Sequence, residues 1–275
     1  MQTMSECPKA IHHLEEVMGT VVTLDIYPKA DGCDADLSAY LARAEAILQL
    51  ADDVFSTWKP SSPVSRLRRN EITLEQAPPE VAEVFELCGI ARQISGGWFD
   101  PWAMPGGFDP TGYVKGWAAQ CALEALISSD VSGAIVNAAG DIASFGAMEN
   151  NQPFRIGIVD PFEKSQLACV VELSAAVATS GTYERGNHLI DPHSSLPTAR
   201  VASATVVGDD LGLADALATA VAVGGAEVLP LIEHLDGYEA FIIGLDTSRL
   251  WTAQFPFAST RDREKVRDDG SNAER

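Results

Sequence analysis

The chain is predicted to fold as an α+β protein, because its helical patterns gather in the first half and its strand patterns in the second. Residues 36–55 and 79–94 carry apolar side chains at the spacing of an amphipathic helix. Beyond Gly133, short β-branched and apolar runs follow one another. A doubly wound sheet would alternate strands and helices along the whole chain, so the α+β class is favoured.

The remaining elements are assigned from the same patterns and from glycine and proline breakers. Residues 1–12 are expected to be a loose leader, and residues 258–275, which are charged and poor in apolar side chains, a disordered tail. Residues 1–257 show no repeat and no clear linker, so a single domain is expected, with two subdomains as the alternative. Further helices are expected at 115–127, 211–223 and 228–233, and strands at 18–27, 134–137, 154–159, 168–173, 176–180, 200–207 and 239–245.

The charge of the chain restricts its ligands. Its 275 residues carry a formal net charge of −20, with an ordinary hydrophobic share of 46%. Such a charge repels the phosphates of nucleic acids and anionic membrane surfaces, so neither is an expected partner. A bare phosphate ligand is also disfavoured unless a metal ion or local cations reverse the field.

The cysteines and the apolar runs indicate a reducing compartment. The five cysteines are scattered, and no two of them have the spacing of metal ligands. They are expected to be free structural thiols. No basic stretch followed by an apolar run opens the chain, and no apolar segment is expected to be long enough to span a membrane. We therefore expect a cytoplasmic protein without membrane insertion.

Several common catalytic motifs are absent from the sequence. It contains no GxGxxG after a strand, no GxxxxGK[ST] loop, no GxSxG elbow and no HExxH. Nucleotide-binding folds that depend on these motifs are therefore disfavoured.

A carboxylate and a hydroxyl lie one helical turn apart in the predicted helix 211–223. Asp215 and Thr219 are four residues apart, so their oxygens project from one face of that helix. Oxygen ligands of this kind suit magnesium, which needs only one or two protein ligands when phosphates and water supply the rest. The alternative is structural: Asp215 would cap the helix and Thr219 would bond to a backbone carbonyl.

Two other polar segments have both a structural and a functional interpretation. Arg66, Arg68 and Arg69 form either a solvated basic turn or a site that attracts anions. In residues 179–192, a strand ends at Ser180 and Gly181, where free backbone N–H groups can face an anion.

His188, in the same segment, is either structural or a general base or hydrogen-bond donor to the ligand. A catalytic triad of Ser180, His188 and Asp191 is conceivable, but their spacing gives it no support.

Seven short segments carry a more specific signal, because they occur together and in order across about residues 15–245. They are 18–20 (MGT), 55–58 (FSTW), 97–100 (GWFD), Asp109 with 115–118 (KGWA), 137–141 (NAAGD), 179–192 (TSGTYERGNHLIDP) and 214–219 (ADALAT). In these segments the chain resembles the ApbE family, the FAD:protein FMN transferases. The resemblance implies an ApbE-like fold with a mostly antiparallel sheet and packed helices.

The resemblance also implies a site for magnesium and FAD. Asp215, Thr219 and the backbone carbonyl of Gly112 match the magnesium ligands of the family. Lys115 and Asp215, with His188, are predicted to be catalytic. The predicted FAD contacts are Met18, Trp58, Trp98, Phe99, Asp100, Asp109, Lys115, Ser180 and His188. Magnesium and Lys115 would neutralise the pyrophosphate, which answers the problem of the net charge.

The implied activity is magnesium-dependent transfer of FMN from FAD to a threonine or serine hydroxyl of a client flavoprotein, with release of AMP. Two alternatives use the same site: a magnesium-dependent FAD pyrophosphatase that forms FMN and AMP, and an FAD-binding protein without turnover. The chain itself contains no acceptor segment of the usual kind, so modification of another protein is expected.

The chain departs from the family pattern at several places. Ala139 precedes Gly140 where two glycines are usual, a small change if Ala139 has a negative φ. The segment around Gly112 is less apolar than usual, and His193 begins a His-Ser-Ser run in place of a basic residue followed by Thr-Gly. Cys7 follows no apolar segment, so the lipid attachment of exported relatives is not expected.

Overall fold

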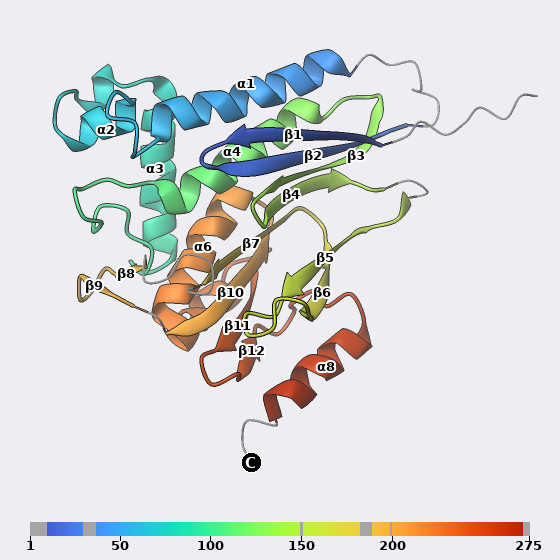
Figure 1. Cartoon of the computed structure of the whole chain (residues 1–275). Helices are drawn as coiled ribbons and strands as arrows, with labels where there is room; N and C mark the ends of the chain where they lie inside the picture. The colour runs from blue at the N-terminus through green and yellow to red at the C-terminus, as the bar shows by residue number, and fades with distance from the viewer. Residues whose placement is uncertain (1–9, 30–36, 149–150, 182–188, 199, 272–275) are drawn as a thin grey trace, which may run out of the picture.

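A computed structural model describes residues 10–29, 37–148, 151–181, 189–198 and 200–271. Its main feature is an eight-stranded sheet with the strand order β1-β2-β3-β4-β7-β10-β11-β12 (Figure 1). Every strand pair in this sheet is antiparallel. Most of the longer helices precede the strands of the second half, so the predicted α+β class with a mostly antiparallel sheet is confirmed.

The strands form one large sheet and two short hairpins. The large sheet consists of β1 (Ile11–Val17), β2 (Thr20–Pro28), β3 (Val131–Ala138), β4 (Asp141–Gly146), β7 (Ala176–Gly181), β10 (Val201–Gly208), β11 (Glu239–Gly244) and β12 (Arg249–Trp251). The two hairpins are β5 (Phe154–Val159) with β6 (Leu167–Leu173), and β8 (Ile190–Asp191) with β9 (Leu196–Pro197).

Two of the helices, α4 (Thr111–Leu126) and α6 (Leu211–Gly224), both line a cavity and pack against the large sheet. The others are α1 (Ser38–Phe55), α2 (Pro63–Arg68), α3 (Pro79–Ile94), α7 (Leu229–Glu233) and α8 (Thr260–Ser271), with short 3-10 turns at Leu74–Gln76 and Gly225–Val228. Helix α4 packs between α1 and α6, and α6 lies against β7 and β10.

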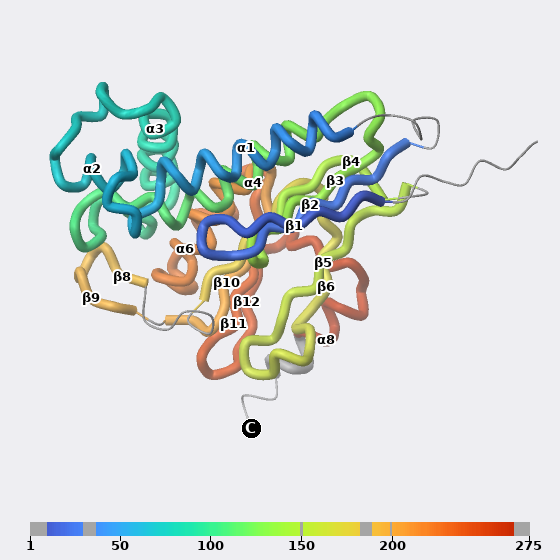
Figure 2. Tube along the Cα trace, turned by 45° about the horizontal axis from the view of Figure 1, so that its top comes forward, coloured from blue at the N-terminus to red at the C-terminus, as the bar shows by residue number. Residues whose placement is uncertain are grey.

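The sheet separates two hydrophobic cores. Successive residues on a strand point to opposite faces, so Val206 joins the core beneath the helices whereas Val207 joins the core beneath the β5–β6 hairpin. In β11, Ile242 and Ile243 divide in the same way. Figure 2 shows α1, α3 and α6 on one side of the strands and the β5–β6 hairpin on the other. The central strands are therefore buried on both faces.

Two hairpin turns use backbone conformations that the sequence patterns did not reveal. The strand expected from Met18 begins at Thr20, because Met18 (φ 54°) and Gly19 (φ 70°) form the two-residue turn after β1. At the β3–β4 turn, Ala139 has a φ of 54°, so the condition under which alanine would be a small change from glycine, a negative φ, is not met. Two-residue hairpins favour positive φ at both central positions, because this matches the twist of the strands.

Some elements were missed or misplaced because their local pattern is weak. Strand β1 begins at Ile11, within the expected leader, and β4 and β12 were not predicted. Residues 63–68 form helix α2, not a turn, with Ser62 as its N-cap. Helix α4 follows Pro110 as its N-cap and begins at Thr111, four residues before the predicted start. The first turn was missed because Gly112 has a low helix propensity and weakens the helical pattern there.

The expectation of a disordered tail is wrong for the residues up to Ser271. Ser259 and Asp262 exchange hydrogen bonds at the start of α8, and Lys265 Nζ donates to the carbonyl oxygen of Leu167 at 2.6 Å. Val266 is fully buried in the core beneath the β5–β6 hairpin. A buried apolar side chain and a hydrogen bond to β6 therefore hold a segment whose composition is otherwise that of a solvated tail.

Residues 211–233 correct another expectation. This 23-residue stretch, which contains α6, is apolar and long enough to span a membrane, although no such segment was expected. Most of it is buried inside the fold. Its composition is explained by α6 packing between the sheet and α4, where nearly every face of the helix is covered.

The strained turn at Ala139 leads to a stability prediction. Replacing Ala139 with glycine should raise the free energy of unfolding by about 1 kcal/mol, because a Cβ atom disfavours the left-handed conformation. Urea unfolding measures this value. Ala46→Gly, at an exposed position inside α1, is the matched control and should lower it by about 1 kcal/mol. An Ala139→Gly protein no more stable than the parent would show that the turn is not strained.

Candidate functional site

A cavity of about 790 Å³ opens where α1, α4, α6 and the end of β7 meet. The predicted site residues come from six separate segments of the chain, and the fold gathers those that the structure describes around this cavity. His188 lies outside the described residues. The other predicted site residues all line the cavity, namely Met18, Trp58, Trp98, Phe99, Asp100, Asp109, Gly112, Lys115, Ser180, Asp215 and Thr219.

Helix α6 presents a carboxylate that is not a helix cap. The N-cap of α6 is Asp210, whose side chain accepts a hydrogen bond from Leu213 N at 2.7 Å. Asp215 lies one turn further along, is 4% exposed and faces the cavity. The structural alternative, in which Asp215 caps the helix, is therefore wrong.

Glycines in α4 allow it to approach α6 closely enough to share this wall. A Cβ atom at Gly116 would lie 2.4 Å from the carbonyl oxygen of Leu211, so no other residue fits there without movement. The backbone N–H of Gly116 points to Asp215 Oδ2 at 3.4 Å. The helix contact thus brings the α6 carboxylate against the α4 backbone.

Oxygen donors gather beside Asp215. Thr219 Oγ1 lies 3.2 Å from Ser180 Oγ, which comes from the end of β7. A Cβ atom built on Gly112 would lie 3.3 Å from Thr219 Oγ1, so the first turn of α4 passes close to the same hydroxyl. A buried carboxylate, two hydroxyls and a nearby backbone form the type of oxygen-rich donor set that hard divalent cations prefer.

Lys115 reaches the cavity and is held by a buried acid. Its ammonium group contacts the carboxylate of Asp141, which is 1% exposed. The other carboxylate oxygen of Asp141 accepts a hydrogen bond from Thr179 N at 3.0 Å. The lysine side chain is 21% exposed, so the ion pair with Asp141 fixes one positive charge at the wall of the cavity that Asp215 also lines.

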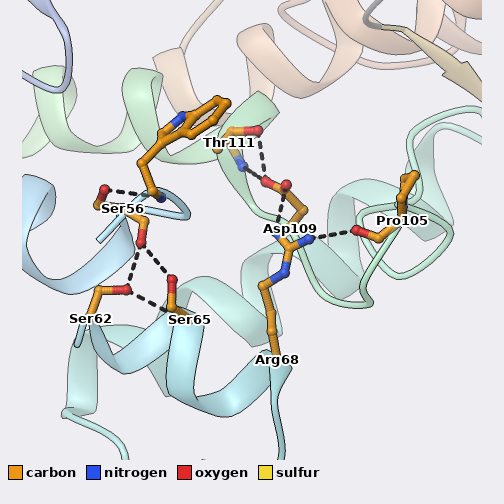
Figure 3. A network of polar contacts seen from close by, with 8 residues as sticks. Ser56, Ser62, Ser65, Arg68, Pro105, Asp109 and Thr111 are labelled. Atoms are coloured by element: carbon orange, nitrogen blue, oxygen red, sulfur yellow. Dashed lines mark hydrogen bonds and ion pairs between the residues drawn. The ribbon is translucent and has the colours of Figure 1, made fainter. Parts of the chain in front are cut away.

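The wall around Asp109 is organised by α2 (Figure 3). Arg68 Nη1 donates to Asp109 Oδ2 at 2.7 Å, and Asp109 Oδ1 accepts from the backbone and hydroxyl of Thr111. Arg66 and Arg69 instead pair with Glu71 at the surface. None of these three arginines lines the cavity. The basic segment is thus neither a turn nor a cluster facing the cavity, and Arg68 was missed as a supporting residue.

Trp58 presents an uncovered ring at the cavity. Its side chain is 92% exposed, whereas its backbone is fixed by a hydrogen bond from Trp58 N to Ser56 Oγ. The hydroxyls of Ser62 and Ser65 both donate to the carbonyl oxygen of Ser56 (Figure 3). The ring is therefore supported from the backbone side and left free for an apolar or planar ligand.

A second tryptophan of the cavity, Trp98, packs against residues that the sequence patterns did not identify as its neighbours. The centroid of the Trp98 ring lies 4.4 Å from the centroid of the His193 ring and 5.0 Å from the guanidinium carbon of Arg200. Arg200 also contacts Asp191 at 3.5 Å. His193 was noticed as a departure from the family pattern, but no spacing rule connects it with Trp98.

The described cysteines do not contribute a reactive thiol to the cavity. Cys88, Cys121 and Cys169 are free. Burial raises the pKa of Cys88, and raises those of Cys121 and Cys169 to about 12. A thiol with so high a pKa is protonated and a poor nucleophile at neutral pH. These three residues fit the predicted structural role.

Comparison with known proteins gives a consistent family match. The family model of the ApbE family matches residues 18–106 and 103–242. A protein from Rhodobacter capsulatus named FAD:protein FMN transferase is 34% identical over 139 residues, which cover 47% of this chain and 26% of that protein. One of the same name from Vibrio cholerae is 29% identical over 150 residues, covering 46% of this chain and 45% of that one. The matches thus span less than half of these relatives.

Solved structures show the same fold at low sequence identity. The flavin transferase ApbE from Vibrio cholerae has a TM-score of 0.78 at 20% identity, covering 90% of this chain and 98% of that one. The apo form of the flavinyl transferase ApbE from Pseudomonas stutzeri has a TM-score of 0.75 at 23% identity, and the match covers 90% of this chain and 96% of that one. The ApbE protein from Thermotoga maritima has a TM-score of 0.75 at 20% identity, and the match covers 89% of this chain and 97% of that one.

The buried pair at the cavity wall leads to a second prediction. Lys115→Met should lower the free energy of unfolding by about 2 kcal/mol or more, because it leaves the Asp141 carboxylate buried without its cation. Denaturant unfolding at neutral pH measures the change. The decrease in the free energy of unfolding should be smaller when Lys115→Met is made in an Asp141→Asn protein.

The control for this prediction is Lys59→Met. Lys59 donates to Asp52 and Asp53 at 2.6 and 2.8 Å, and these hydrogen bonds raise its pKa, but the group is exposed. Exposed pairs contribute little to stability, so this change should be small. Equal losses at the two lysines would contradict the assignment of a buried pair.

Proposed function

Because the chain belongs to the ApbE family, we propose that it transfers FMN from FAD to a threonine or serine hydroxyl of a client protein and releases AMP. The observation that carries this proposal is the convergence of Asp215 and Thr219 from α6 with Lys115 from α4 at one cavity wall. The names of the curated relatives, FAD:protein FMN transferase, support the same assignment.

The cavity offers separate surfaces for the two chemically different parts of FAD. Lys115 provides a positive charge for the pyrophosphate, and its ion pair with Asp141 fixes the direction of the ammonium group. The exposed ring of Trp58 provides a planar apolar surface for an aromatic ring. A volume of about 790 Å³ lies within the range of small-molecule and cofactor sites.

The donors beside Asp215 fit magnesium. Asp215, Thr219 and the backbone carbonyl of Gly112 would hold the ion, as the oxygen donors gathered there suggest. When bound, magnesium would supply positive charge to the phosphoryl oxygens. The glycine contact between α4 and α6 keeps these donors in place before the substrate arrives, which is the preorganisation that electrostatic catalysis requires.

The proposed reaction exchanges one phosphorus–oxygen bond for another. The hydroxyl oxygen of the client attacks the phosphorus of the FMN half, and the bond from that phosphorus to the bridging oxygen breaks. AMP leaves with that oxygen, and the hydroxyl proton passes to a base. Lys115 stabilises the negative charge that gathers on the phosphoryl oxygens. His188 remains the predicted base, although it lies outside the described residues.

Incubation of the purified protein with FAD, magnesium and a candidate acceptor separates the transferase from the alternatives. AMP together with FMN-labelled acceptor, detected by mass spectrometry, is the expected outcome. AMP with free FMN and unlabelled acceptor would indicate a pyrophosphatase. Tightly bound FAD without any AMP would indicate a binding protein and would contradict the proposed activity.

A third prediction concerns the α6 carboxylate. Asp215→Asn should reduce AMP release roughly 100-fold or more, because loss of a charged ligand removes several kcal/mol of transition-state stabilisation. Asp210→Asn is the matched control on the same helix, since asparagine also caps helices well. It should leave turnover close to that of the parent. Similar rates for both variants would remove Asp215 from the proposed machinery.

A fourth prediction concerns removal of the metal. EDTA should weaken FAD binding far more than riboflavin binding, because only FAD brings a dianionic pyrophosphate close to Asp215. Two unit charges about 4 Å apart cost about 4 kcal/mol at an effective dielectric of about 20. Titrations by flavin fluorescence, with magnesium and with EDTA, measure both ligands. Equal FAD affinity in the two conditions would require the metal-dependent proposal to be abandoned.

A further inference from the structure

Arg68 connects α2 to the loop that precedes α4. Its guanidinium group donates to Asp109 Oδ2 at 2.7 Å and to the carbonyl oxygen of Pro105 at 2.6 Å (Figure 3). The side chains of Arg68 and Asp109 are only 17% and 16% exposed, so this pair is shielded more than an ordinary surface pair. A shielded arginine–carboxylate contact is strong and restricts orientation.

The two neighbouring arginines do not share this role. Arg69 donates to both carboxylate oxygens of Glu71 and to the carbonyl oxygen of Pro60, and Arg66 lies 3.7 Å from the same glutamate. Both side chains are nearly half exposed. The chain thus provides a control arginine, Arg69, that is adjacent in sequence and similarly paired but not in contact with Asp109.

Asp109 is held at both of its oxygens. Oδ2 accepts from Arg68, and Oδ1 accepts from Thr111 N at 3.2 Å and from Thr111 Oγ1 at 2.8 Å. The residue also lines the cavity. An ionised carboxylate can only accept hydrogen bonds, so from a ligand it selects an N–H or O–H group, not a phosphate oxygen. FAD carries such donors on the flavin ring, the ribityl chain and the adenine.

The loop that packs on Arg68 depends on a glycine at the point of contact. Gly106 has a φ of 86°, and a Cβ atom there would lie 2.9 Å from Arg68 Nη2. Gly107 has almost the same φ, 89°, but a Cβ atom there would meet nothing within 4 Å. These two glycines separate the effect of backbone strain from the effect of displacing the guanidinium group.

We propose that Arg68 is a positioning residue of the ligand site, which holds the Asp109 carboxylate so that it accepts a hydrogen bond from an N–H or O–H group of FAD. The inference rests on the proposed function, because it takes FAD as the occupant of the cavity. It adds a residue outside the cavity wall that acts through Asp109. Arg68 itself does not touch the ligand.

The test measures FAD affinity by flavin fluorescence in the presence of magnesium. The parent protein is titrated first, because a parent that does not bind FAD would overturn the proposed function itself. With binding established, Arg68→Met should raise the Kd about tenfold or more, as expected when a hydrogen bond to a charged group is lost. Arg69→Met should change it less than twofold. Equal effects at the two positions would overturn the role of Arg68.

A double-mutant cycle distinguishes positioning from general support. Asp109→Ala should weaken FAD binding by itself. In that background, Arg68→Met should change the Kd less than twofold, because no carboxylate remains to be positioned. The same tenfold loss in both backgrounds would show that Arg68 supports the fold and does not act through Asp109. Arg68→Lys keeps the charge but not the paired geometry, and should lie between the parent and Arg68→Met.

The glycine pair tests the same contact without changing any charge, and covers the case in which Arg68→Met does not fold. Gly106→Ala and Gly107→Ala impose similar backbone strain, so both should lower the melting temperature by similar amounts. Gly106→Ala alone displaces the guanidinium group, and should raise the FAD Kd at least threefold more than Gly107→Ala. Equal Kd values for the two variants would contradict the proposal.

Discussion

The close contact between α4 and α6 is the constraint on which the rest of the site depends. At Gly116, a single added carbon atom would lie 2.4 Å from a backbone oxygen of α6, so the two helices pack at a separation that only glycine permits. This separation places Gly112 and Lys115 of one helix beside Asp215 and Thr219 of the other. Both helices are fixed in turn by the sheet, because α6 lies on β7 and β10 and α4 lies on β3.

Several carboxylates at or beside the cavity are each paired with a cation, although the chain as a whole carries a net charge of −20. Three acidic residues at or beside its wall each have a cationic partner from a different helix. Asp109 pairs with an arginine of α2, Asp100 with Arg92 of α3, and Asp141 with Lys115 of α4. These pairs allow carboxylates to serve as oriented hydrogen-bond acceptors within a strongly acidic protein, because each desolvated charge is compensated where it lies.

An element or contact of this structure can be predicted from the sequence when the residues that determine it lie close together along the chain. Helix α3 was predicted with its observed bounds because its apolar period is complete within the segment. Helix α8 was missed because one buried valine, Val266, holds it against strands distant in the sequence. The cavity residues were found through their ordered motifs. Arg68 was not placed at the site, because its partner Asp109 is 41 residues away and no periodicity connects them.

The exposure of Trp58 has a thermodynamic consequence. Trp58 is 92% exposed, so folding leaves the apolar surface of this large aromatic ring in water. A planar ligand that stacks on it removes apolar area of both partners from water in one step. Association of the proposed flavin ligand would then carry a negative change in heat capacity, and its enthalpy would become more favourable as temperature rises.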